Sequence, residues 1–528
     1  MEARIQGAGG CQYPCHNAQM ADDSEVDLLV IGGGINGAGI ARDAAGRGLR
    51  VMLVEQGDLA GATSSASSKM AHGGLRYLEQ GELRLVRESL REREVLLRIA
   101  PHLVRPLTFV LPWAPQMRPA WQIRLGLWLY DRLGGARVLS RSRGVTLAPG
   151  QSNPLRPEFT RGFTYSDCWV EDARLVVANA RDAADRGAAV LTRTRCTAVE
   201  TSGRTWRIRL DNAAGERMHV SARAVVNAAG PWVSSLLREG AAMDAEPTVR
   251  LVKGSHFVVP RRWTGEHAFI LQNDDRRVVF VLPFEDDFAL IGTTDVALER
   301  MPESLEISAE ETEYLCRAVN RYLSLSVHPG DIVWSFSGVR ALYDDGVTNP
   351  SQVTRDYHLT LHRSTGGAPL LSVLGGKVTT YRRLAERVTA KLAPFFPSLG
   401  PEWTAQTALP GGALPAGGVE GLISALQTRY PGVPPEWLRG LVQRHGERAS
   451  AVLGKARIAD DLGTHFGAGL TAREVDYLVR REWAASAEDI LWRRTKAGLR
   501  VGVEGRQALE RYLGAMRPQP AAAGANPA

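Results

Sequence analysis

A glycine-rich segment near the N-terminus has the spacing that a dinucleotide-binding site needs. Gly32-Gly-Gly34-Ile-Asn-Gly37 matches the pattern G-x-G-x-x-G. The first glycine permits a tight turn, the second lets a pyrophosphate approach the backbone, and the third lets a helix pack closely on a strand. Amide groups at the start of that helix can then bind the phosphates. Eighteen residues after Gly37, the carboxylate of Glu55 can accept hydrogen bonds from both ribose hydroxyls and would repel the 2′-phosphate of NADP.

Two later glycine segments indicate that the ligand of this turn is long. Asn227-Ala-Ala-Gly230 and Gly375-Gly376 each follow a short apolar run, so the backbone can approach a ligand again at both places. The sequence contains no second G-x-G-x-x-G segment for a nicotinamide dinucleotide. We therefore expect a flavin that takes its electrons directly from the substrate. NAD alone, or a glycine turn without a ligand, is the alternative.

The scarcity of lysine makes Lys377 a candidate for binding a phosphate. Only six of the 64 basic residues are lysine, and Lys377 directly follows Gly375-Gly376. An ammonium group binds phosphate as a compact point charge, whereas a guanidinium binds as a planar fork. For any single arginine among the other 58, a solvated position on the surface is the alternative.

The composition bounds the class of protein. The chain has 528 residues, of which 44% are hydrophobic and 23% charged, which is typical of a globular protein with two to four domains. A net charge of +7 keeps nucleic acid, an acidic membrane surface and an anionic substrate as candidates. Arginine alternates with glutamate, as in Arg91-Glu-Arg-Glu94, which is typical of paired helix faces and argues against nucleic acid.

Cysteine usage and hydropathy exclude further classes. Five cysteines are an odd and sparse set, which is no disulfide framework and favours a reducing cytoplasm. Cys11, Cys15 and His16 lack a second ligand pair at zinc spacing, so we expect no metal site. Residues 1–23 lack the charged and apolar regions of a secretory signal. No window of 18 or more apolar residues occurs, so we expect no membrane-spanning helix.

The elements that must position these residues follow from the periodicity of the sequence. Residues 27–31, 35–46 and 50–55 predict a strand, a helix and a strand, the unit that begins a doubly wound sheet. Residues 251–294 contain four short strand-like runs between polar turns, which predicts an inserted antiparallel sheet. Residues 370–374 and 379–392 predict a further strand and helix, and residues 421–515 are helical in pattern.

These elements predict six segments along the chain. We expect a disordered extension at 1–24, a discontinuous FAD-binding domain at 25–100, 161–250 and 340–396, a substrate-binding or cap domain at 101–160 and 251–339, a linker at 397–420, a C-terminal helical domain at 421–516 and a disordered tail at 517–528.

Motifs spread over residues 25–515 resemble those of the FAD-dependent glycerol-3-phosphate dehydrogenases, the aerobic, respiratory, quinone-linked family. They are Val30-Ile-Gly-Gly-Gly-Ile-Asn-Gly-Ala-Gly39, Ala62-Thr-Ser-Ser-Ala-Ser-Ser-Lys69, His72-Gly-Gly-Leu-Arg-Tyr77, Tyr165-Ser-Asp-Cys-Trp-Val170, Lys253-Gly-Ser-His256, Ile291-Gly-Thr-Thr-Asp295, Ser337-Gly-Val-Arg340 and Gly375-Gly-Lys377. The resemblance implies an α/β fold with a glutathione-reductase-like FAD-binding Rossmann domain, an inserted antiparallel β substrate or cap domain and a C-terminal α-helical domain. It also implies oxidation of sn-glycerol 3-phosphate to dihydroxyacetone phosphate, with the hydride passing to N5 of the flavin.

The resemblance also implies which residues bind the substrate, namely Arg76, Tyr77, Arg340, Arg355 and Lys377. His256 is our first choice for the catalytic base, because the pKa of an imidazole lies near the operating pH. His72 is the alternative base, and a structural hydrogen bond is the alternative role for either histidine. Arg340 could share the catalytic role by lowering the pKa of the alcohol. Asp295 is assigned no chemistry and is expected to organise the end of a strand.

The residues expected to face FAD are glycines, hydroxyl-bearing residues and their immediate neighbours. They are Gly32, Gly34, Ile35, Asn36, Gly37, Glu55, Thr63, Ser64, Ser65, Ser68, Lys69, His72, Gly73, Gly74, Ala229, Gly230, Gly375, Gly376, Lys377 and Thr379. A polar loop without a ligand is the alternative for the serine-rich part of this set.

The expected electron acceptor is a membrane quinone. Molecular oxygen is the alternative, in a glycerol-3-phosphate oxidase or another oxidase of the same fold. Residues 120–133 combine two tryptophans and two arginines with aliphatic residues, which is typical of a helix at a membrane interface, although a buried cap-domain helix is the alternative. We expect a cytoplasmic homodimer bound peripherally to the inner face of the cell membrane through residues 112–133, with no nucleic acid partner.

Overall fold

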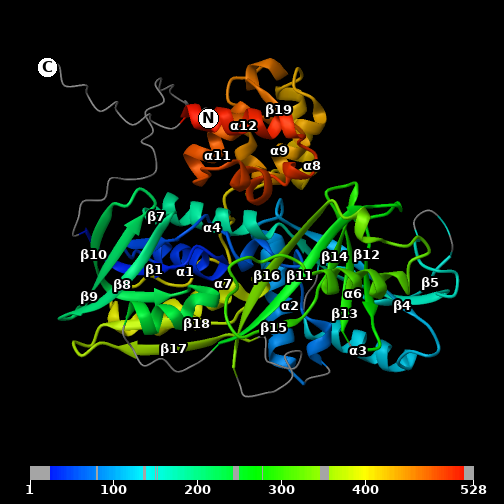
Figure 1. The fold of residues 1–528 in the computed structure, drawn as a ribbon, viewed down its shortest axis with the longest axis horizontal. Coiled ribbons are helices and arrows are strands. Elements are labelled where there is room, and N and C mark those ends of the chain that lie inside the picture. The colour runs from blue at the N-terminus through cyan, green and yellow to red at the C-terminus, as the bar shows by residue number, and fades with distance from the viewer. Residues whose placement is uncertain are drawn as a thin grey trace.

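Two large β-sheets lie side by side, and a C-terminal helical domain packs over the boundary between them (Figure 1). The computed structural model describes residues 24–78, 81–134, 138–148, 150, 153–241, 249–275, 277–344 and 356–516. The expected disorder of residues 1–24 and 517–528 therefore falls almost wholly outside the described residues, as do Cys11, Cys15 and His16.

The first sheet has a parallel centre, in the order β17-β18-β10-β1-β2-β7. Its strands are β1 (Ser24–Ile31), β2 (Val51–Val54), β7 (Ala189–Leu191), β8 (Thr194–Ser202), β9 (Thr205–Asn212), β10 (Arg217–Asn227), β17 (His358–Arg363) and β18 (Pro369–Leu374). Residues 28–30 of β1 are wholly buried, because helices and further strands cover both faces of a central parallel strand. Strand β1 pairs in parallel with β2 and with β10, which confirms the predicted strand–helix–strand unit.

Three helices cover one face of this sheet. Helix α1 (Ile35–Gly46) packs against both α4 (Asp172–Asp185) and α7 (Tyr381–Leu392). Small residues make this close packing feasible, since a Cβ atom on Gly39 would lie 2.6 Å from the ring of Tyr381. A Cβ atom on Gly46 would lie 2.1 Å from Trp403, so the predicted linker segment packs directly on α1.

The second sheet has ten strands. They are β3 (Met70–Ala71), β4 (Val104–Trp113), β5 (Arg143–Thr146), β6 (Arg161–Val170), β11 (Val249–Pro260), β12 (Ala268–Gln272), β13 (Val278–Phe284), β14 (Phe288–Gly292), β15 (Val296–Leu298) and β16 (Trp334–Tyr343). The four predicted strand-like runs of residues 251–294 are β11 to β14, and they pair antiparallel, which confirms the prediction. Strand β12 also pairs in parallel with β4, so the sheet as a whole is mixed. Strand β6 pairs with β4 over ten residues, which places residues 161–170 in this sheet although the predicted boundary assigned them to the FAD-binding domain.

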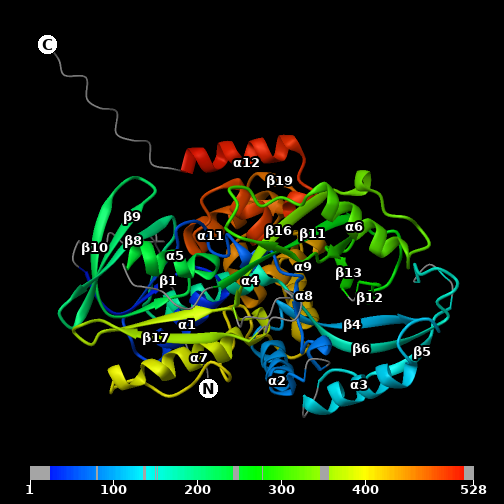
Figure 2. The ribbon, with the colours of Figure 1, turned by 60° about the horizontal axis from the view of Figure 1, so that its bottom comes forward.

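Helices pack around the second sheet and form the C-terminal domain. Beside the sheet are η2 (Leu75–Leu78), α2 (Leu83–Ile99), α3 (Ala120–Leu133) and α6 (Ala309–Asn320). The C-terminal domain contains α8 (Gly418–Arg429), α9 (Pro435–His445), η8 (Gly446–Arg448), α10 (Ala449–Leu453), β19 (His465–Gly467), β20 (Leu470–Thr471), α11 (Ala472–Glu482), η10 (Asp489–Arg494) and α12 (Val503–Met516). Helix α3 lies on the side of the molecule away from this domain (Figures 1 and 2).

Within the described ranges, no helix combines the length and low charge needed to cross a bilayer. The same ranges hold no group of three or more His, Cys, Asp or Glu side chains placed to bind a metal ion.

Candidate functional site

A cavity of about 810 Å³ lies between the two sheets. Its wall includes the glycine turn after β1, residues 54–58 and 61–64 after β2, and residues 375–379 after β18. The opposite wall comes from β11 and β16 of the second sheet. Its volume is typical of a ligand site, and it lies at the carboxyl ends of the parallel strands, where doubly wound folds bind their ligands.

The glycine turn leaves no space for side chains. Gly32 has a φ of +112°, and a Cβ atom there would lie 2.5 Å from the carbonyl oxygen of Ala228. A Cβ atom on Gly37 would lie 1.9 Å from the carbonyl oxygen of Gly32. At the start of α1, the Ile35 amide donates a hydrogen bond of 2.9 Å to Oγ of Ser64. Residues 34–36 line the cavity, so the first turn of α1 borders the place where a pyrophosphate would lie.

Glu55 is held on the cavity wall by two backbone amides. Gly33 N–H donates to its Oε2 at 2.6 Å, and Gly57 N–H donates to its Oε1 at 2.7 Å. Burial raises the pKa of the Glu55 carboxyl above its usual range, although both amides oppose this effect. The carboxyl group is thus fixed in orientation at the end of β2, where it can accept hydrogen bonds from ribose hydroxyls.

A buried ion pair anchors the serine-rich loop that forms the cavity wall between the sheets. Nζ of Lys69 lies 2.8 Å from both carboxylate oxygens of Asp172, and both side chains are wholly buried. Asp172 also accepts hydrogen bonds from Oγ of Ser67 at 2.7 Å and from the Ala173 amide at 2.8 Å. The loop is therefore tied to the first residue of α4, where the helix dipole favours a carboxylate.

His256 lies on β11 with its ring fixed on several sides. Its Nε2 is 2.8 Å from Oγ of Ser68, and the ring stacks on Phe336 with centroids 5.0 Å apart. A Cβ atom on Gly292 would lie 2.1 Å from the ring, so glycine is required on the neighbouring strand. Nδ1 is buried without a hydrogen-bond partner among the described residues. Burial, with help from the charges of Arg340 and Lys69, holds the pKa of His256 well below its usual value, so the ring is neutral at pH 7.

Arg340 extends from β16 into the cavity wall opposite the glycine turn. Its guanidinium pairs with Asp295 and donates a hydrogen bond of 3.0 Å to Oγ1 of Thr293. A Cβ atom on Gly254 would lie 2.2 Å from Nη2 of Arg340, so the glycine of β11 provides the space for the guanidinium. Asp295 thus orients the guanidinium of Arg340, a role that we did not predict from the sequence.

Lys377 lies at the end of β18, on the same cavity. Its Nζ is 3.9 Å from the centre of the Tyr77 ring, a cation–π contact. Gly375 and Gly376 have φ values of +75° and +101°, and Nδ2 of Asn36 donates a hydrogen bond of 3.1 Å to the carbonyl oxygen of Gly375. The turn that carries Lys377 is therefore joined to the start of α1.

Most of the residues predicted from the sequence line this one cavity. These are Gly32, Gly34, Ile35, Asn36, Glu55, Thr63, Ser64, Ser68, His72, Gly74, Tyr77, Ala229, Gly230, His256, Arg340, Gly375, Gly376, Lys377 and Thr379. Gly37, Ser65, Lys69 and Gly73 do not line it and lie behind the wall. The side chain of Arg76 and the whole of Arg355 lie outside the described residues.

Other residues on the cavity wall were not predicted. Residues 194–197 line it after β7, and Asp295 and Thr293 line it beside Arg340. Arg493 reaches it from the C-terminal domain. Asp295 lies within a motif already singled out, so its signal was present in the sequence. Arg493 carried no signal, because it is one arginine among 58 and is distant in sequence from the rest of the site.

The residues present fit a bound FAD. The glycine turn excludes side chains where a pyrophosphate would approach the backbone, and Glu55 presents its carboxyl group where a ribose would lie. From there the cavity continues to His256 and Arg340 on the second sheet, so a reactive ring at that end would face a base and a cation.

Comparison with known proteins also indicates an FAD-dependent enzyme. Residues 27–382 match the family model described as FAD dependent oxidoreductase, and residues 402–521 match that of the C-terminal domain of alpha-glycerophosphate oxidase. The chain is 51% identical to a glycerol-3-phosphate dehydrogenase of Pseudomonas aeruginosa, over 93% of this chain and 96% of that protein. It is 50% identical to a D-erythritol 1-phosphate dehydrogenase of Brucella abortus, over 90% of this chain and 95% of that protein.

The fold also matches a solved structure. The glycerol-3-phosphate dehydrogenase of Bacillus halodurans, solved in complex with FAD, superposes with a TM-score of 0.70 at 28% identity. The match covers 90% of this chain and 87% of that one.

The Lys69–Asp172 pair should be essential for stability. Replacing Lys69 by Met removes one partner and leaves a buried carboxylate, which should lower the free energy of unfolding by about 3–5 kcal/mol. Urea titration measures this change. The control is Arg50→Met, which breaks the Arg50–Asp27 pair, whose arginine side chain is 60% exposed, and should cost about 0–1 kcal/mol. Equal losses in the two variants would contradict the anchoring role of Lys69.

Proposed function

The chain belongs to the FAD-dependent oxidoreductase family, and on this basis we propose that it oxidises sn-glycerol 3-phosphate to dihydroxyacetone phosphate. It is an FAD enzyme, as the family model and its relatives at about 50% identity establish. The observation that supports the substrate best is the single cavity that holds a dinucleotide turn, the neutral imidazole of His256 and the cations of Arg340 and Lys377. A phosphate-bearing alcohol needs all three.

The chemistry divides among these groups as follows. Oxidation of the C2 alcohol removes the hydroxyl proton and the C2 hydride, and a carbonyl group forms. Bound FAD supplies the acceptor for the hydride, at N5 of its flavin. We assign the proton to His256: in the tautomer that carries its hydrogen on Nε2 and donates it to Oγ of Ser68, Nδ1 is the acceptor. Lys377 and Arg340 hold the phosphate and the alcohol oxygen, and Tyr77 positions the ammonium group of Lys377.

Anaerobic mixing of the purified protein with glycerol 3-phosphate tests the proposal directly. We expect the flavin absorbance to bleach, because two electrons pass from the substrate to the cofactor. A protein whose flavin stays oxidised would overturn the proposal. D-erythritol 1-phosphate, the substrate named for one relative, is tested in the same way, and faster bleaching with it would make that longer polyol phosphate the preferred substrate.

Substitution of Lys377 by Met should impair the use of the phosphorylated substrate selectively. Loss of a charge-assisted hydrogen bond costs about 1.5–3 kcal/mol, which is roughly a ten- to 150-fold fall in kcat/KM for glycerol 3-phosphate. Unphosphorylated glycerol, which lacks the partner of this ammonium group, should be oxidised at nearly the wild-type rate. Equal losses on both substrates would remove Lys377 from phosphate binding.

The pH dependence of flavin reduction should reveal the base. Because the pKa of His256 is held well below 6.5, the ring stays unprotonated and active as the pH falls through 6.5. The ratio of wild-type to His256→Gln reduction rates should therefore be constant from about pH 8 to 6.5 and decline only at lower pH. The ratio removes the titration of the substrate phosphate, which both proteins share. A decline centred at or above 6.5, or a ratio near one, would contradict the role of His256.

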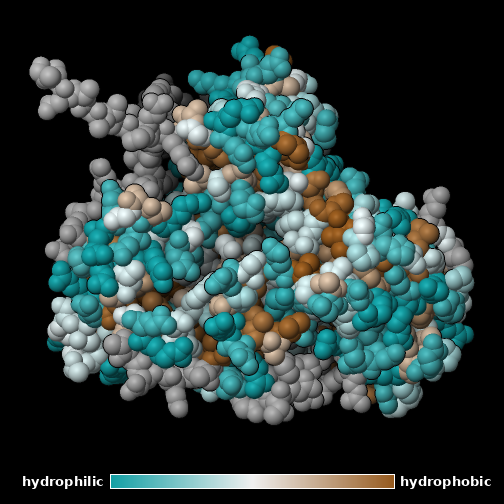
Figure 3. Space-filling model, in the orientation of Figure 1, coloured by the Kyte–Doolittle hydropathy of each residue, from teal (hydrophilic) through white to brown (hydrophobic). Residues whose placement is uncertain are grey.

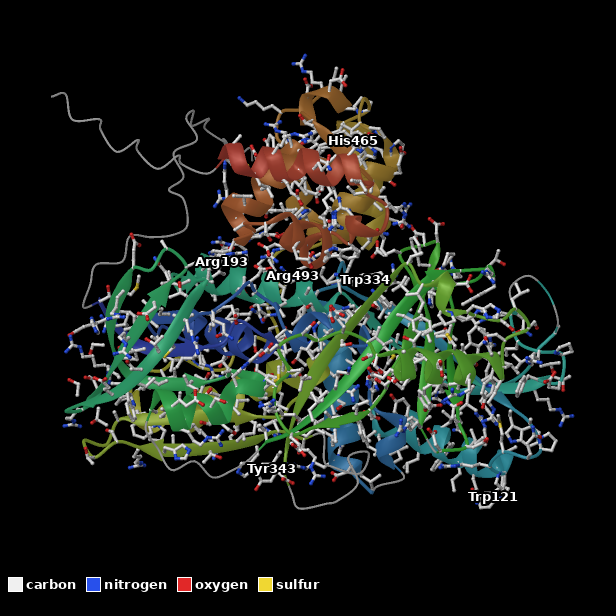
Figure 4. The ribbon with its side chains drawn as sticks, in the orientation of Figure 1. Trp121, Arg193, Trp334, Tyr343, His465 and Arg493 are labelled. Carbon is white, nitrogen blue, oxygen red and sulfur yellow. The ribbon has the colours of Figure 1, made fainter. Side chains whose placement is uncertain are left out.

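The acceptor and the location of the protein belong to the same proposal. We propose a membrane quinone as acceptor and peripheral binding of a cytoplasmic homodimer to the inner face of the cell membrane. On α3, Trp121, Leu125 and Trp128 are exposed by 66%, 55% and 46%, although they are large and apolar. Figure 4 shows Trp121 at the outer edge of the molecule, away from the C-terminal domain. Exposed tryptophans beside arginines are typical of helices that lie in a membrane interface.

The buried face of α3 supports a quinone route from this side. Ile123 and Leu127 belong to the same hydrophobic cluster as Ile270, Val278 and Phe280, which line the cavity. A continuous set of packed apolar side chains therefore connects the helix that we place at the membrane with the wall of the cavity.

Hydrogen peroxide release with glycerol 3-phosphate and no quinone would instead favour oxygen as the acceptor.

Vesicle binding tests the membrane surface. The triple change of Trp121, Leu125 and Trp128 to Ser should abolish co-sedimentation with anionic vesicles, because it removes the apolar face that enters the interface. The matched control changes Leu325, Ile458 and Val503 to Ser, which are also exposed and apolar but lie on other elements. Unchanged co-sedimentation of the α3 variant in a folded protein would show that this surface does not bind membranes.

A further inference from the structure

The C-terminal domain reaches the cavity through one short helix. Among residues 402–516 of the described chain, Arg493 of η10 lines the cavity. Figure 4 shows Arg193, Arg493 and Trp334 along the boundary between this domain and the two sheets. Hydrophobic residues also gather where the domain meets the rest of the chain (Figure 3). The position of η10 thus brings the guanidinium of Arg493 to the cavity wall.

Arg493 binds a carboxylate that belongs to the cofactor end of the cavity. Its Nε lies 2.6 Å from Oδ2 of Asp58, which also lines the cavity and follows Glu55 by three residues. The wholly buried Arg494 binds both oxygens of Asp58, at 2.7 and 2.8 Å. Nη2 of Arg493 lies 2.5 Å from Asp489 of the same helix. Two consecutive arginines of η10 therefore converge on the loop that carries Glu55.

A second loop at this end of the cavity is fixed by the same helix. The side chain of Arg193 pairs with Asp489 of η10, and the Arg193 amide donates to the carbonyl oxygen of Gly57 at 2.8 Å. The Thr194 amide donates to the carbonyl oxygen of Glu55 at 2.8 Å. Residues 55–58 and 194–197 both line the cavity and both are held by η10, directly or through one residue.

The guanidinium of Arg493 is suited to contact a planar ligand. Three carboxylates pair with its edges, those of Asp58, Asp489 and, at 3.8 Å, Glu488. Its side chain remains 16% exposed, and it lies on the cavity wall beside the expected ribose site of Glu55. A guanidinium held at its edges still has a planar face, and such faces stack on aromatic rings. The adenine of a dinucleotide is the aromatic group that belongs beside that ribose.

We propose that Arg493 is a cofactor-binding residue and that the C-terminal domain closes the adenosine end of the FAD site through it. FAD binding should then depend on Arg493 itself and not on the general strength of the contact between the C-terminal domain and the rest of the chain. The inference depends on FAD binding but not on the identity of the substrate. Failure of the proposed oxidation would leave it standing, and its own failure would leave the oxidation untouched.

Flavin retention by the purified holoenzyme tests the proposal. The Arg493→Gln variant and the wild type are diluted in series, and the flavin released is measured by absorbance after ultrafiltration. Loss of a desolvated cation–π contact should raise the dissociation constant of FAD about five- to thirtyfold. The matched control is Arg448→Gln, because Arg448 also joins the C-terminal domain to the sheets, at 2.6 Å from Asp185, but does not line the cavity.

The comparison of the two variants decides the outcome. Weaker FAD binding in Arg493→Gln, with wild-type binding in Arg448→Gln, supports the proposal. Wild-type binding in both variants overturns it, and so does an equal loss in both, because that would be a general effect of weaker domain docking.

Hydrogen exchange on the wild type provides a second test that needs no variant. FAD should slow amide exchange in η10 more than in η8, relative to the flavin-depleted protein, because only η10 reaches the cavity. Equal effects of FAD on η8 and η10 would overturn the proposal even if Arg493→Gln did not fold.

Discussion

The buried pair of Lys69 and Asp172 joins the two halves of the molecule. The chain first crosses from the first sheet to the second along residues 63–70 and first returns through residues 170–172, and these two segments meet at this pair. The Val170 amide also donates to the carbonyl oxygen of Lys69 at 2.9 Å. Because a buried charge is tolerated only with its partner in place, the relative position of the two sheets is fixed here. Ser68, one residue away, thereby meets His256 of the second sheet.

Arg340, Lys377 and His256 are each held in the cavity wall by a different kind of contact. Arg340 forms an ion pair with Asp295, so its guanidinium is well oriented and its charge is partly offset by the carboxylate. The ammonium group of Lys377 lies over the ring of Tyr77, which positions it. The neutral ring of His256 lies between Ser68 and Phe336, where a protonated imidazole would be disfavoured by burial and by two nearby cations. The cations on the cavity wall are therefore suited to an anionic ligand, and the imidazole beside them is uncharged.

Contacts of η10 also extend to the reactive end of the cavity. Trp492, adjacent to Arg493, stacks on Trp334 of β16 with centroids 4.4 Å apart, and Trp334 contacts Phe336 at 4.8 Å. Phe336 is the ring on which His256 stacks. A Cβ atom on Gly498 would lie 2.6 Å from Trp492, so a glycine makes space for this indole. The C-terminal domain therefore packs both on the loop that carries Glu55 and on the aromatic residues beside His256.

Local spacing along the sequence is enough to predict several parts of this protein. The glycine turn, Glu55 at the end of its strand and the helix of residues 35–46 follow from short-range sterics and hydrogen bonding, and the motifs around His256, Arg340 and Lys377 marked further parts of the site. Contacts between distant segments, in contrast, are found only in the folded chain. Folding placed Lys69 on Asp172 behind the cavity wall and Asp295 beside Arg340. It also paired β4 with β12 in parallel and brought Arg493 to the loop that carries Glu55. The reason is that long-range pairing depends on how whole elements pack, and no spacing within the sequence encodes which of 58 arginines meets a given carboxylate.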